Sequence, residues 1–268
     1  MSAAVVASGW SAHLSLGFTQ CGSKTVLAHR SQDGPLVVQK PLYPEGEEVC
    51  HAIVVHPPGG IAGGDQLSLE VKGEGHAVLT TPGAAKWYRS AGPWATQKLS
   101  FEVAGTLEWL PRETIVFDGA LAELECEVHL KGAARYIGWE LVCLGRTGSG
   151  ERFSRGRLRI DTRIARNEEL LWMERGEIEG GSALMRSPVG LAGKTVFGNL
   201  VAAAPRFEPA LVNACRKITA TTVLPGVLVA RYLGDSTEEA FDRFRSLWSL
   251  LRPAVSGRDA VEPRIWRT

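Results

Sequence analysis

The segment Leu124-Glu125-Cys126-Glu127-Val128-His129-Leu130-Lys131 alternates strictly between apolar and polar side chains. Because successive side chains of a strand point to opposite faces, this period of two predicts a β-strand with one buried and one solvated face. The same alternation occurs at 67–72, 98–103 and 157–164, and glycine-containing turn signals separate these segments. The pattern predicts a mostly β fold of large, antiparallel, stacked sheets with few helices.

One amphipathic helix is predicted near the C-terminus. Ser236-Thr-Glu-Glu239 has the form of a capping box, and Pro253 is expected to lie beyond the end of the helix. The apolar stripe between them predicts a face that packs on the protein itself or docks on a partner, and it includes Phe241, Phe244 and Trp248. A second helix is considered at 184–200, although glycines and a proline disfavour it.

Composition narrows the class of protein. The chain has 268 residues and a formal net charge of +1, which gives no electrostatic footprint for nucleic acid or an anionic membrane. Its five cysteines form no CxxC pair, so we expect a reducing compartment. Residues 1–10 lack the basic start of a secretion signal, and no apolar run is long enough for a membrane helix. We therefore expect one cytoplasmic domain, 1–268.

The segment His56-Pro-Pro-Gly59-Gly60-Ile-Ala-Gly63-Gly64-Asp65 places an imidazole and a carboxylate at the two ends of a stretch that cannot form a helix. Its glycines do not have the spacing of a dinucleotide fingerprint. It is either a shaped loop that approaches a ligand or a plain connection between strands.

Two classes of catalytic site are disfavoured. The segment 188–195 ends in Gly193-Lys194-Thr195, but Pro188 replaces the first glycine of a phosphate-binding loop, so we expect no bound nucleotide. No GxSxG or SxxK motif occurs. A small-molecule hydrolase that uses the glycine-rich loops as its pocket remains the alternative to a non-enzymatic protein.

Metal ligands are sparse. The six histidines are dispersed without an HxH or HExxH pair, which argues against a preformed zinc cage. A looser set that holds a divalent ion briefly is possible in His56, Asp65, Asp118 and Glu140, and each of them is also explained as a hydrogen-bonded structural residue.

Two polar loops complete the candidates. The cluster Lys86-Trp-Tyr88-Arg89-Ser90 suits an anion, a protein interface or an ordinary surface turn. In the loop 145–151, an ion pair between Arg146 and Glu151 is expected to close the loop.

Taken in order, several segments resemble one family, that of the urease accessory protein UreD, called UreH in some organisms. Besides the glycine-rich segment and Gly145-Arg146 with Gly150-Glu151, they are Pro41-Leu-Tyr-Pro-Glu-Gly46, Thr80-Thr-Pro-Gly-Ala-Ala-Lys-Trp-Tyr-Arg-Ser90, Leu107-Glu-Trp-Leu-Pro-Arg-Glu-Thr-Ile-Val-Phe-Asp-Gly-Ala120, Gly138-Trp-Glu140 and Pro263-Arg-Ile-Trp-Arg-Thr268. The resemblance covers the chain from about residue 10 to residue 268, as a single UreD-like domain.

The resemblance implies a non-enzymatic maturation factor. Members of the family bind UreF, which recruits the GTPase UreG, and the assembly docks on the urease apoprotein. GTP hydrolysis by UreG is coupled to nickel delivery. It also implies a mostly β fold with an internal passage for nickel, no tightly bound cofactor, transient Ni²⁺, and no nucleotide on this chain itself.

Passage of an ion requires ligands that are strong enough to admit it and weak enough to release it. By resemblance, His56, Asp65, Asp118 and Glu140 are expected along the nickel route. Folding or partner contacts are implied for the other family-motif residues, which are Gly59, Gly60, Gly63, Gly64, Lys86, Tyr88, Arg89, Glu113, Phe117, Gly119, Arg146 and Glu151. Phe241, Phe244 and Trp248 are expected to lie on a helix face that packs into the core or contacts a partner. The region after Pro253 is expected to help seat UreF.

Overall fold

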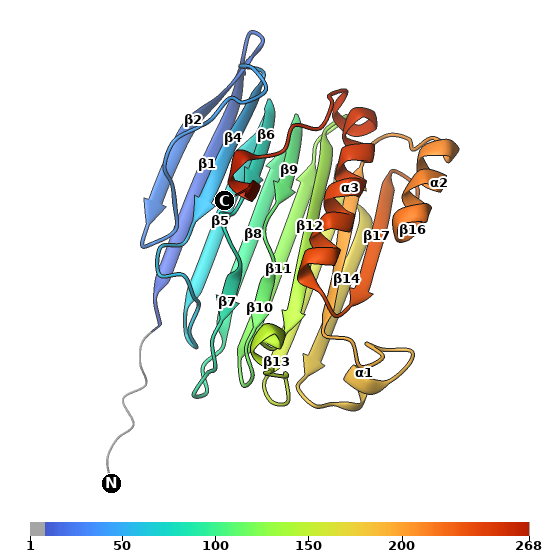
Figure 1. The fold of residues 1–268 in the computed structure, drawn as a ribbon. Coiled ribbons are helices and arrows are strands. Elements are labelled where there is room, and N and C mark those ends of the chain that lie inside the picture. Colours follow the sequence, from blue (N-terminus) through green and yellow to red (C-terminus); the bar gives the residue numbers. More distant parts are fainter. Residues whose placement is uncertain (1–8, 268) are drawn as a thin grey trace.

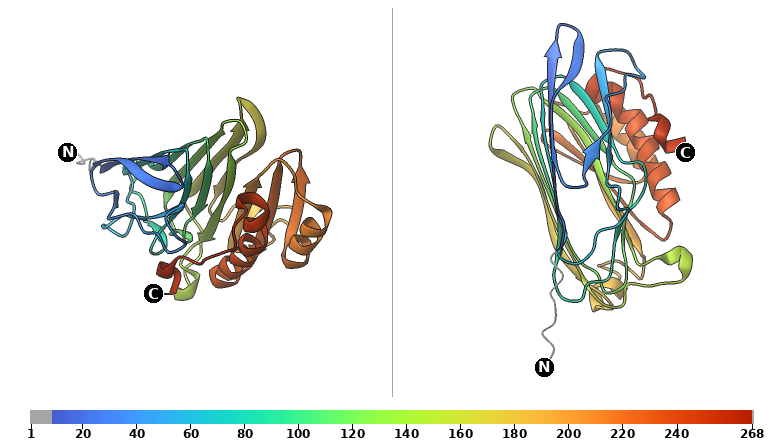
Figure 2. Two further views of the ribbon diagram at one scale, coloured as in Figure 1. Left: turned by 90° about the horizontal axis from the view of Figure 1, so that it is seen from above. Right: turned by 90° about the vertical axis from the view of Figure 1, so that its left-hand side faces the viewer.

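The computed structural model of the protein describes residues 9–267 (Figure 1). Two large β-sheets lie face to face, and a long C-terminal helix covers the outer face of one of them (Figure 2). Residues 1–8, on which most of the argument against a secretion signal rests, lie outside the described residues, as does Thr268 at the end of the last family motif.

The first sheet has seven strands. In spatial order they are β14 (Glu169–Glu179), β13 (Arg157–Arg166), β11 (Leu121–Leu130), β8 (Ala95–Val103), β5 (Gln66–Gly73), β1 (Ser11–Cys21) and β2 (Lys24–Asp33). All four segments with a period of two form strands, as predicted, and all of them lie in this sheet, in β5, β8, β11 and β13.

The second sheet has ten strands. Its main path is β16 (Ala220–Leu224), β17 (Val227–Gly234), β15 (Val196–Ala203), β12 (Arg135–Leu144), β9 (Thr106–Leu110), β6 (His76–Thr80), β4 (Val49–Val55) and β3 (Val37–Val38). Two short strands lie off this path, since β10 (Thr114–Val116) pairs with both β12 and β7 (Ala85–Trp87).

The mostly β, stacked-sheet prediction is confirmed, but the prediction of antiparallel sheets is wrong for their centres. The chain passes from β5 to β6, from β8 to β9 and from β11 to β12, so each turn carries it from one sheet to the other. Successive strands of one sheet therefore run in the same direction, as in the parallel pairs β5–β8, β8–β11, β6–β9 and β9–β12. Antiparallel pairs such as β1–β2, β13–β14 and β12–β15 lie toward the margins. A period of two reports which face is buried and carries no information on pairing direction.

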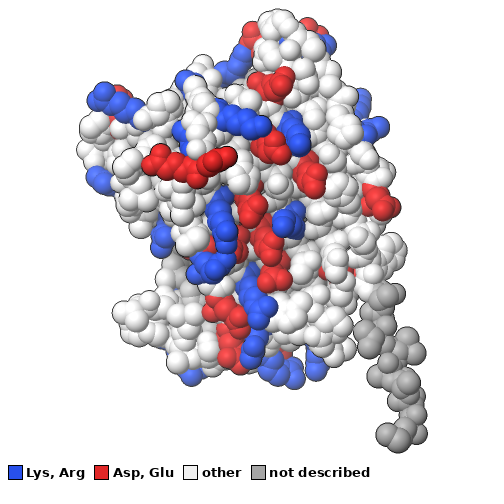
Figure 3. All heavy atoms as spheres, turned by 180° about the vertical axis from the view of Figure 1, so that it is seen from behind, with Lys and Arg blue, Asp and Glu red and all other residues white. Residues whose placement is uncertain are grey.

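The outer face of the seven-stranded sheet carries the polar half of the alternation. Ion pairs cross from strand to strand there, including Lys98 with Glu125 at 3.7 Å and Arg159 with Glu177 at 2.9 Å. Figure 3 shows basic and acidic side chains interleaved over this face. The apolar half, for example Leu69, Leu99 and Leu158, forms the core between the sheets.

The C-terminal helix α3 (Thr237–Ser256) packs on the other face of the second sheet. The Ser236 hydroxyl accepts a hydrogen bond from the Glu239 amide at 3.1 Å, which confirms the predicted start. The predicted end is wrong, because Pro253 lies inside the last turn. The helix continues to Ser256 and ends where Gly257 adopts φ = 73°.

The other helices are short. The second helix considered at 184–200 is not formed, since α1 (Ala183–Arg186) has four residues and β15 starts at Val196. Between β15 and β16 lies α2 (Pro209–Ile218), and two 3₁₀ turns occupy Thr147–Ser149 and Arg264–Arg267. Within residues 9–267, no helix combines the length and apolar character that crossing a bilayer requires.

Candidate functional site

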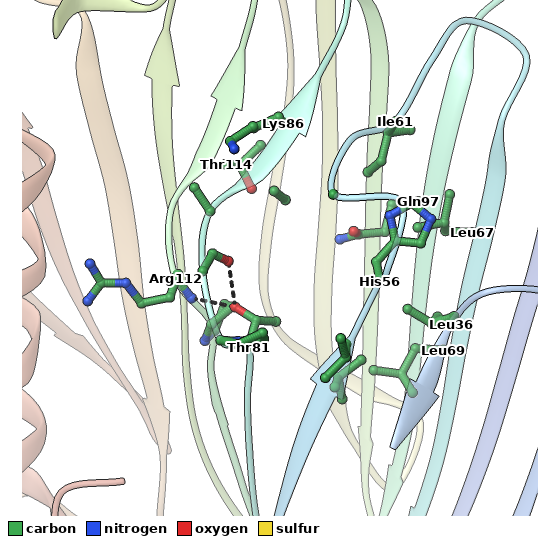
Figure 4. Close-up of a pocket in the computed structure, with 18 of the residues that line it drawn as sticks. Leu36, His56, Ile61, Leu67, Leu69, Thr81, Lys86, Gln97, Arg112 and Thr114 are labelled. Atoms are coloured by element: carbon green, nitrogen blue, oxygen red, sulfur yellow. Dashed lines mark hydrogen bonds between the residues drawn. The ribbon is translucent and has the colours of Figure 1, made fainter. Parts of the chain in front are cut away.

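The larger of the two cavities described here, which we call the main cavity, lies between the two sheets and has a volume of about 270 Å³, which is room for several water molecules (Figure 4). Inward-facing apolar residues of β5 and β8 form part of its wall. Its polar lining includes His56, Lys86, Gln97 and Glu140, from four different segments of the chain. The glycine-rich loop also lines it through Gly59 and Gly60, so this loop does more than connect two strands.

His56 directly follows β4 and reaches the cavity from the side of the glycine-rich loop (Figure 4). The side chain is half-buried. Burial lowers its pKa, and the nearby carboxylate of Asp65 opposes this effect only in part. The imidazole is therefore neutral near pH 7, and a neutral imidazole is the form that binds a divalent metal.

Asp65 is buried and holds the glycine-rich loop in place. Its two carboxylate oxygens accept hydrogen bonds from the amides of Trp10 at 2.8 Å and Ala62 at 2.7 Å. The residue lines neither of the two cavities described here. Asp65 therefore stabilises the loop, and its charge acts on His56 from outside the cavity.

The glycines let the loop approach the segment after β7 closely. A Cβ on Gly60 would lie 2.1 Å from Cε2 of Tyr88, and one on Gly63 would lie 2.3 Å from the Ser90 hydroxyl. Gly59 and Gly64 have φ values of 72° and 98°, which disfavour other residues. The glycines thus allow the close packing that shapes the opening of the cavity beside this loop, which we call the mouth.

Glu140 lies in the middle of β12 and faces the space between the sheets. Burial raises its pKa to about 7, although the Thr114 hydroxyl donates a hydrogen bond to Oε1 at 2.8 Å. The carboxyl group therefore exchanges between its neutral and charged forms near neutral pH.

A second cavity of about 40 Å³ adjoins the main one. Leu99, Trp109 and Glu140 line both, so Glu140 lies where the two spaces meet. The second cavity extends to Glu174 in β14 and Asn199 in β15. The two cavities together form an interrupted path from His56 past Glu140 to Glu174.

The second cavity has its own titratable lining. Burial raises the pKa of Glu174, an effect that Arg231 opposes, and the Asn199 amide donates a hydrogen bond to its carboxylate. Burial also raises the pKa of the Cys126 thiol on the same wall. Within residues 9–267, no three His, Cys, Asp or Glu side chains are grouped closely enough to hold a metal ion. The polar groups are instead spaced along the path.

Asp118 lines neither cavity, and it holds the neighbouring segment at Ser154 and Arg155 in place. Its carboxylate accepts five hydrogen bonds, from the amides of Ser154 and Arg155, the Ser154 hydroxyl and the Arg155 guanidinium. Burial acts to raise its pKa, but these bonds outweigh it and hold the pKa below its usual range. The structure therefore does not bring Asp118 to the path.

Four of the remaining family-motif residues, Tyr88, Phe117, Arg146 and Glu151, form a cluster beside the glycine-rich loop. The ring of Tyr88 packs edge-on against Phe117 at 5.1 Å, and the Arg146 guanidinium covers the Phe117 ring at 4.7 Å. The predicted Arg146–Glu151 pair is formed at 2.7 Å, and Glu151 also accepts the Asp118 amide. This cluster fixes the loops around the mouth.

Three other motif residues complete its surroundings. The aliphatic chain of Arg89 packs on Gly119, where a Cβ would lie 2.9 Å from Cγ. Glu113 lies 3.5 Å from the Arg112 guanidinium, and its carbonyl accepts the Ala85 amide.

Phe241, Phe244 and Trp248 are buried between α3 and the second sheet, which confirms the core-packing prediction.

Sequence reasoning missed Glu174. A signal for it exists, because alternation along β14 places Glu174 on the same face as Trp172 and Ile178, both buried.

Comparison with known proteins identifies the family. The family described as UreD urease accessory protein matches residues 11–267. Relatives named "Urease accessory protein UreD" include those of Dechloromonas aromatica (strain RCB), 52% identical over 273 residues, and Azoarcus sp. (strain BH72), 53% identical over 270 residues. Each alignment covers 97% of this chain and 95% of the relative. A Pseudomonas aeruginosa (strain PAO1) relative is 49% identical with the same coverage. The chain therefore belongs to the UreD urease accessory protein family, and its role lies in urease maturation.

Proposed function

We propose that this chain is a non-catalytic scaffold of cytoplasmic urease maturation that conducts nickel through the space between its two sheets. It binds UreF, and through UreF the GTPase UreG, and it docks on the urease apoprotein. Nickel is a transient cargo in this proposal, and the chain itself binds no nucleotide.

The position of Glu140 carries the proposal. Within residues 9–267, this is the one carboxyl group that lines both cavities, and no basic side chain is bonded to it. An ion that moves between the cavities passes this group. His56 on one side and Glu174 on the other provide further donors in an otherwise largely apolar path.

The chemistry of these groups suits passage rather than storage. Ni²⁺ accepts imidazole nitrogen and carboxylate oxygen, and three or four such donors held together would retain it. In this protein the donors His56, Glu140 and Glu174 are spaced along the path, so an ion would contact them one after another. A carboxyl group with a pKa of about 7 also binds a cation and takes back a proton at little cost near neutral pH. Asp65 and Asp118 support the walls in this proposal and do not touch the ion.

The expected partner surface for UreF includes α3 and the segment after it. Phe241, Phe244 and Trp248 are buried and unavailable to a partner, but Leu250 and Val261 are each 39% exposed on this side of the protein. Substituting both with Asp should weaken the UreF complex while the fold remains intact. Unchanged co-purification with UreF would remove this surface from the proposal.

The route is tested in cells that carry the urease operon. Deletion of the gene should leave assembled urease that is poor in nickel. Glu140→Gln keeps the shape of the side chain and should lower the nickel content of urease several-fold while the UreF complex still forms. The matched control is Glu70→Gln, on the solvent side of β5. Full nickel loading with Glu140→Gln would refute the route through Glu140.

The hydrolase alternative lacks an assembled site in the cavity. The Ser68 hydroxyl does bond to Nδ1 of His13 at 2.7 Å, as a nucleophile and base would. However, His13 does not line the cavity, and its neighbours Ala12 and Leu14 form the core while His13 faces the other side of the sheet. This observation favours a surface hydrogen bond over catalysis.

A further inference from the structure

The second sheet is interrupted where it forms the wall of the main cavity. One gap separates β6, which ends at Thr80, from β7, and the other separates β9, which ends at Leu110, from β10. Residues 81–84 and 111–113 fill these gaps, and all of them except Glu113 line the cavity. Pro82 and Pro111 have no amide to donate to a ladder, so the sheet does not continue across this level. We call this paired interruption the sheet break.

The C-terminal segment covers the sheet break from outside. Trp266 donates from Nε1 to the Thr80 hydroxyl at 3.0 Å, and that hydroxyl in turn donates to the Leu110 carbonyl at 2.6 Å. One side chain thus contacts the start of one gap directly and the start of the other through Thr80. The indole of Trp266 is held by three aromatic neighbours, Trp139 at 5.9 Å, Phe241 at 5.2 Å and Trp248 at 5.6 Å.

Arg112 links the two gaps to each other and to the helix outside the sheet. Its amide donates to the Thr81 hydroxyl at 2.9 Å, which joins the two gaps. Its guanidinium lies 4.1 Å from the ring centre of Phe241 in α3, and Figure 4 shows it pointing away from His56 and toward the helix. Arg112 therefore spans the distance between the cavity wall and the aromatic cluster around Trp266.

The covering segment, residues 257–267, has one anchor near its start and another near its end. Near its start, the buried Arg252 donates to the Asp259 carbonyl at 2.5 Å. Near its end, Trp266 makes the contacts described above. Between them, Glu262 pairs with Arg245 at 3.4 Å and Arg267 at 3.5 Å, and such partly exposed pairs contribute under about 1 kcal/mol. Loss of the Trp266 contacts would therefore release the far end from the sheet break, while α3 and the Arg252 anchor stay in place.

We infer that residues 257–267 are a strap that closes a second opening of the main cavity at the sheet break, with Trp266 as the residue that holds it shut. The first opening lies at the other side, where the exposed Gly59 lines the cavity. The use of a second opening rests on the proposed function, because a passage for cargo needs an entrance and an exit. The strap itself is a property of the isolated chain.

The test compares Trp266→Ala, Trp266→Phe and the control Val261→Ala in the full-length protein. Hydrogen exchange is followed by mass spectrometry in peptides that cover 80–86 and 110–116, where the Ala85 and Arg112 amides are hydrogen-bonded. Trp266→Ala should raise exchange there at least tenfold and leave β5 and β11 unchanged. Trp266→Phe keeps a ring but loses the donor, so its exchange should lie between those of the wild type and Trp266→Ala. Val261→Ala should match the wild type.

Access to the interior is measured on two native thiols. Cys126 lines the second cavity, whereas Cys215 belongs to α2 and is buried in the core beneath α3, away from both cavities. Labelling with methyl methanethiosulfonate, located by mass spectrometry, should become about tenfold faster at Cys126 in Trp266→Ala and stay constant at Cys215. Unchanged exchange at the sheet break, or equal acceleration at both thiols, would overturn the inference. If Trp266→Ala does not fold, the same comparison with Trp266→Phe decides.

These outcomes are independent of nickel. If the strap opens in this test but Glu140→Gln leaves urease fully loaded, the proposed route fails and the strap stands. If Glu140→Gln lowers loading while the sheet break is unaffected by Trp266, the route stands and the strap fails.

Discussion

Arg252 in α3 and Glu108 in β9 form an ion pair at 2.9 Å in which neither side chain is exposed. Glu108 also accepts hydrogen bonds from His76 at 2.6 Å and Trp248 at 2.5 Å. The other side of the Arg252 guanidinium bonds to Glu45 at 2.7 Å, and Glu45 accepts from His51 at 2.6 Å. One buried arginine thus joins the C-terminal helix to Glu108 of the second sheet and to Glu45 in the turn before β4.

Removing this arginine should be strongly destabilising. Arg252→Met leaves two buried carboxylates without their cation, so the free energy of unfolding should fall by about 3 to 5 kcal/mol. The measurement is urea denaturation of purified protein. The control is Arg267→Met, whose side chain is 76% exposed and whose loss should change stability by no more than about 0.5 kcal/mol. A fall of less than 1 kcal/mol for Arg252→Met would contradict this account of the cluster.

The same cluster predicts acid sensitivity. Burial acts to raise the pKa of Glu45, but hydrogen bonds from His51 and Arg252 outweigh it and lower the pKa from 4.5 to about 2. Because the unfolded chain binds this proton first, stability is fully present above about pH 4.5 and is lost as the pH falls toward 2, by about 3 kcal/mol from this group. Denaturant melts between pH 6 and pH 2.5 measure the loss. A flat profile below pH 4.5 would show that Glu45 is not ion-paired in solution.

Glu140 predicts a pH dependence of stability with the opposite sign. Its pKa is raised to about 7 in the folded protein, so the unfolded chain loses this proton at lower pH than the folded protein does. Stability therefore falls as the pH rises from about 4.5 to 7, by about 3 kcal/mol at most. Glu140→Gln should remove this dependence, so its stability relative to the wild type should increase between pH 5 and pH 8. Parallel pH profiles for the two proteins would contradict a buried, proton-holding Glu140.

The glycine-rich loop predicts a clash at one defined position. In Gly60→Ala the new methyl group meets the Tyr88 ring, which packs against Phe117 and must shift at a cost of about 1 to 3 kcal/mol. Gly83→Ala is the matched control, because nothing lies within 4 Å of its Cβ position. In a double-mutant cycle, Tyr88→Ala should relieve most of the cost of Gly60→Ala. Additive effects of the two substitutions would show that the loop relaxes in another way.

Asp118 predicts a separation of stability from nickel loading. Asp118→Asn loses the charged contact to Arg155, so stability should fall by about 1 to 3 kcal/mol. At a temperature where the variant is folded, urease in the same cells should receive its normal nickel content, because Asp118 lies off the path. A several-fold loss of nickel in a fully folded variant would return Asp118 to the route.

Much of the local structure was predictable from neighbouring residues. Alternation placed β5, β8, β11 and β13 and their buried faces, since the period of two depends only on backbone geometry. The capping sequence at Ser236 placed the start of α3 for the same reason. The Arg146–Glu151 pair was also within reach, because the two residues lie five positions apart in one loop.

The direction of pairing, the end of α3 and the path between the sheets depended on contacts between distant segments. Parallel sheet centres arise because each turn crosses to the other sheet, a choice that the alternation of a single strand does not record. Pro253 is tolerated in the last turn of a helix that buried packing holds on the sheet. Asp65 and Glu140 are both carboxylates in family motifs, yet the fold gives one to backbone amides and leaves the other facing two cavities. The sequence determined which residues can carry charge into the interior. The tertiary structure decided which of these charged groups remain available to a ligand there, because that depends on which hydrogen-bond donors the rest of the chain brings within bonding distance.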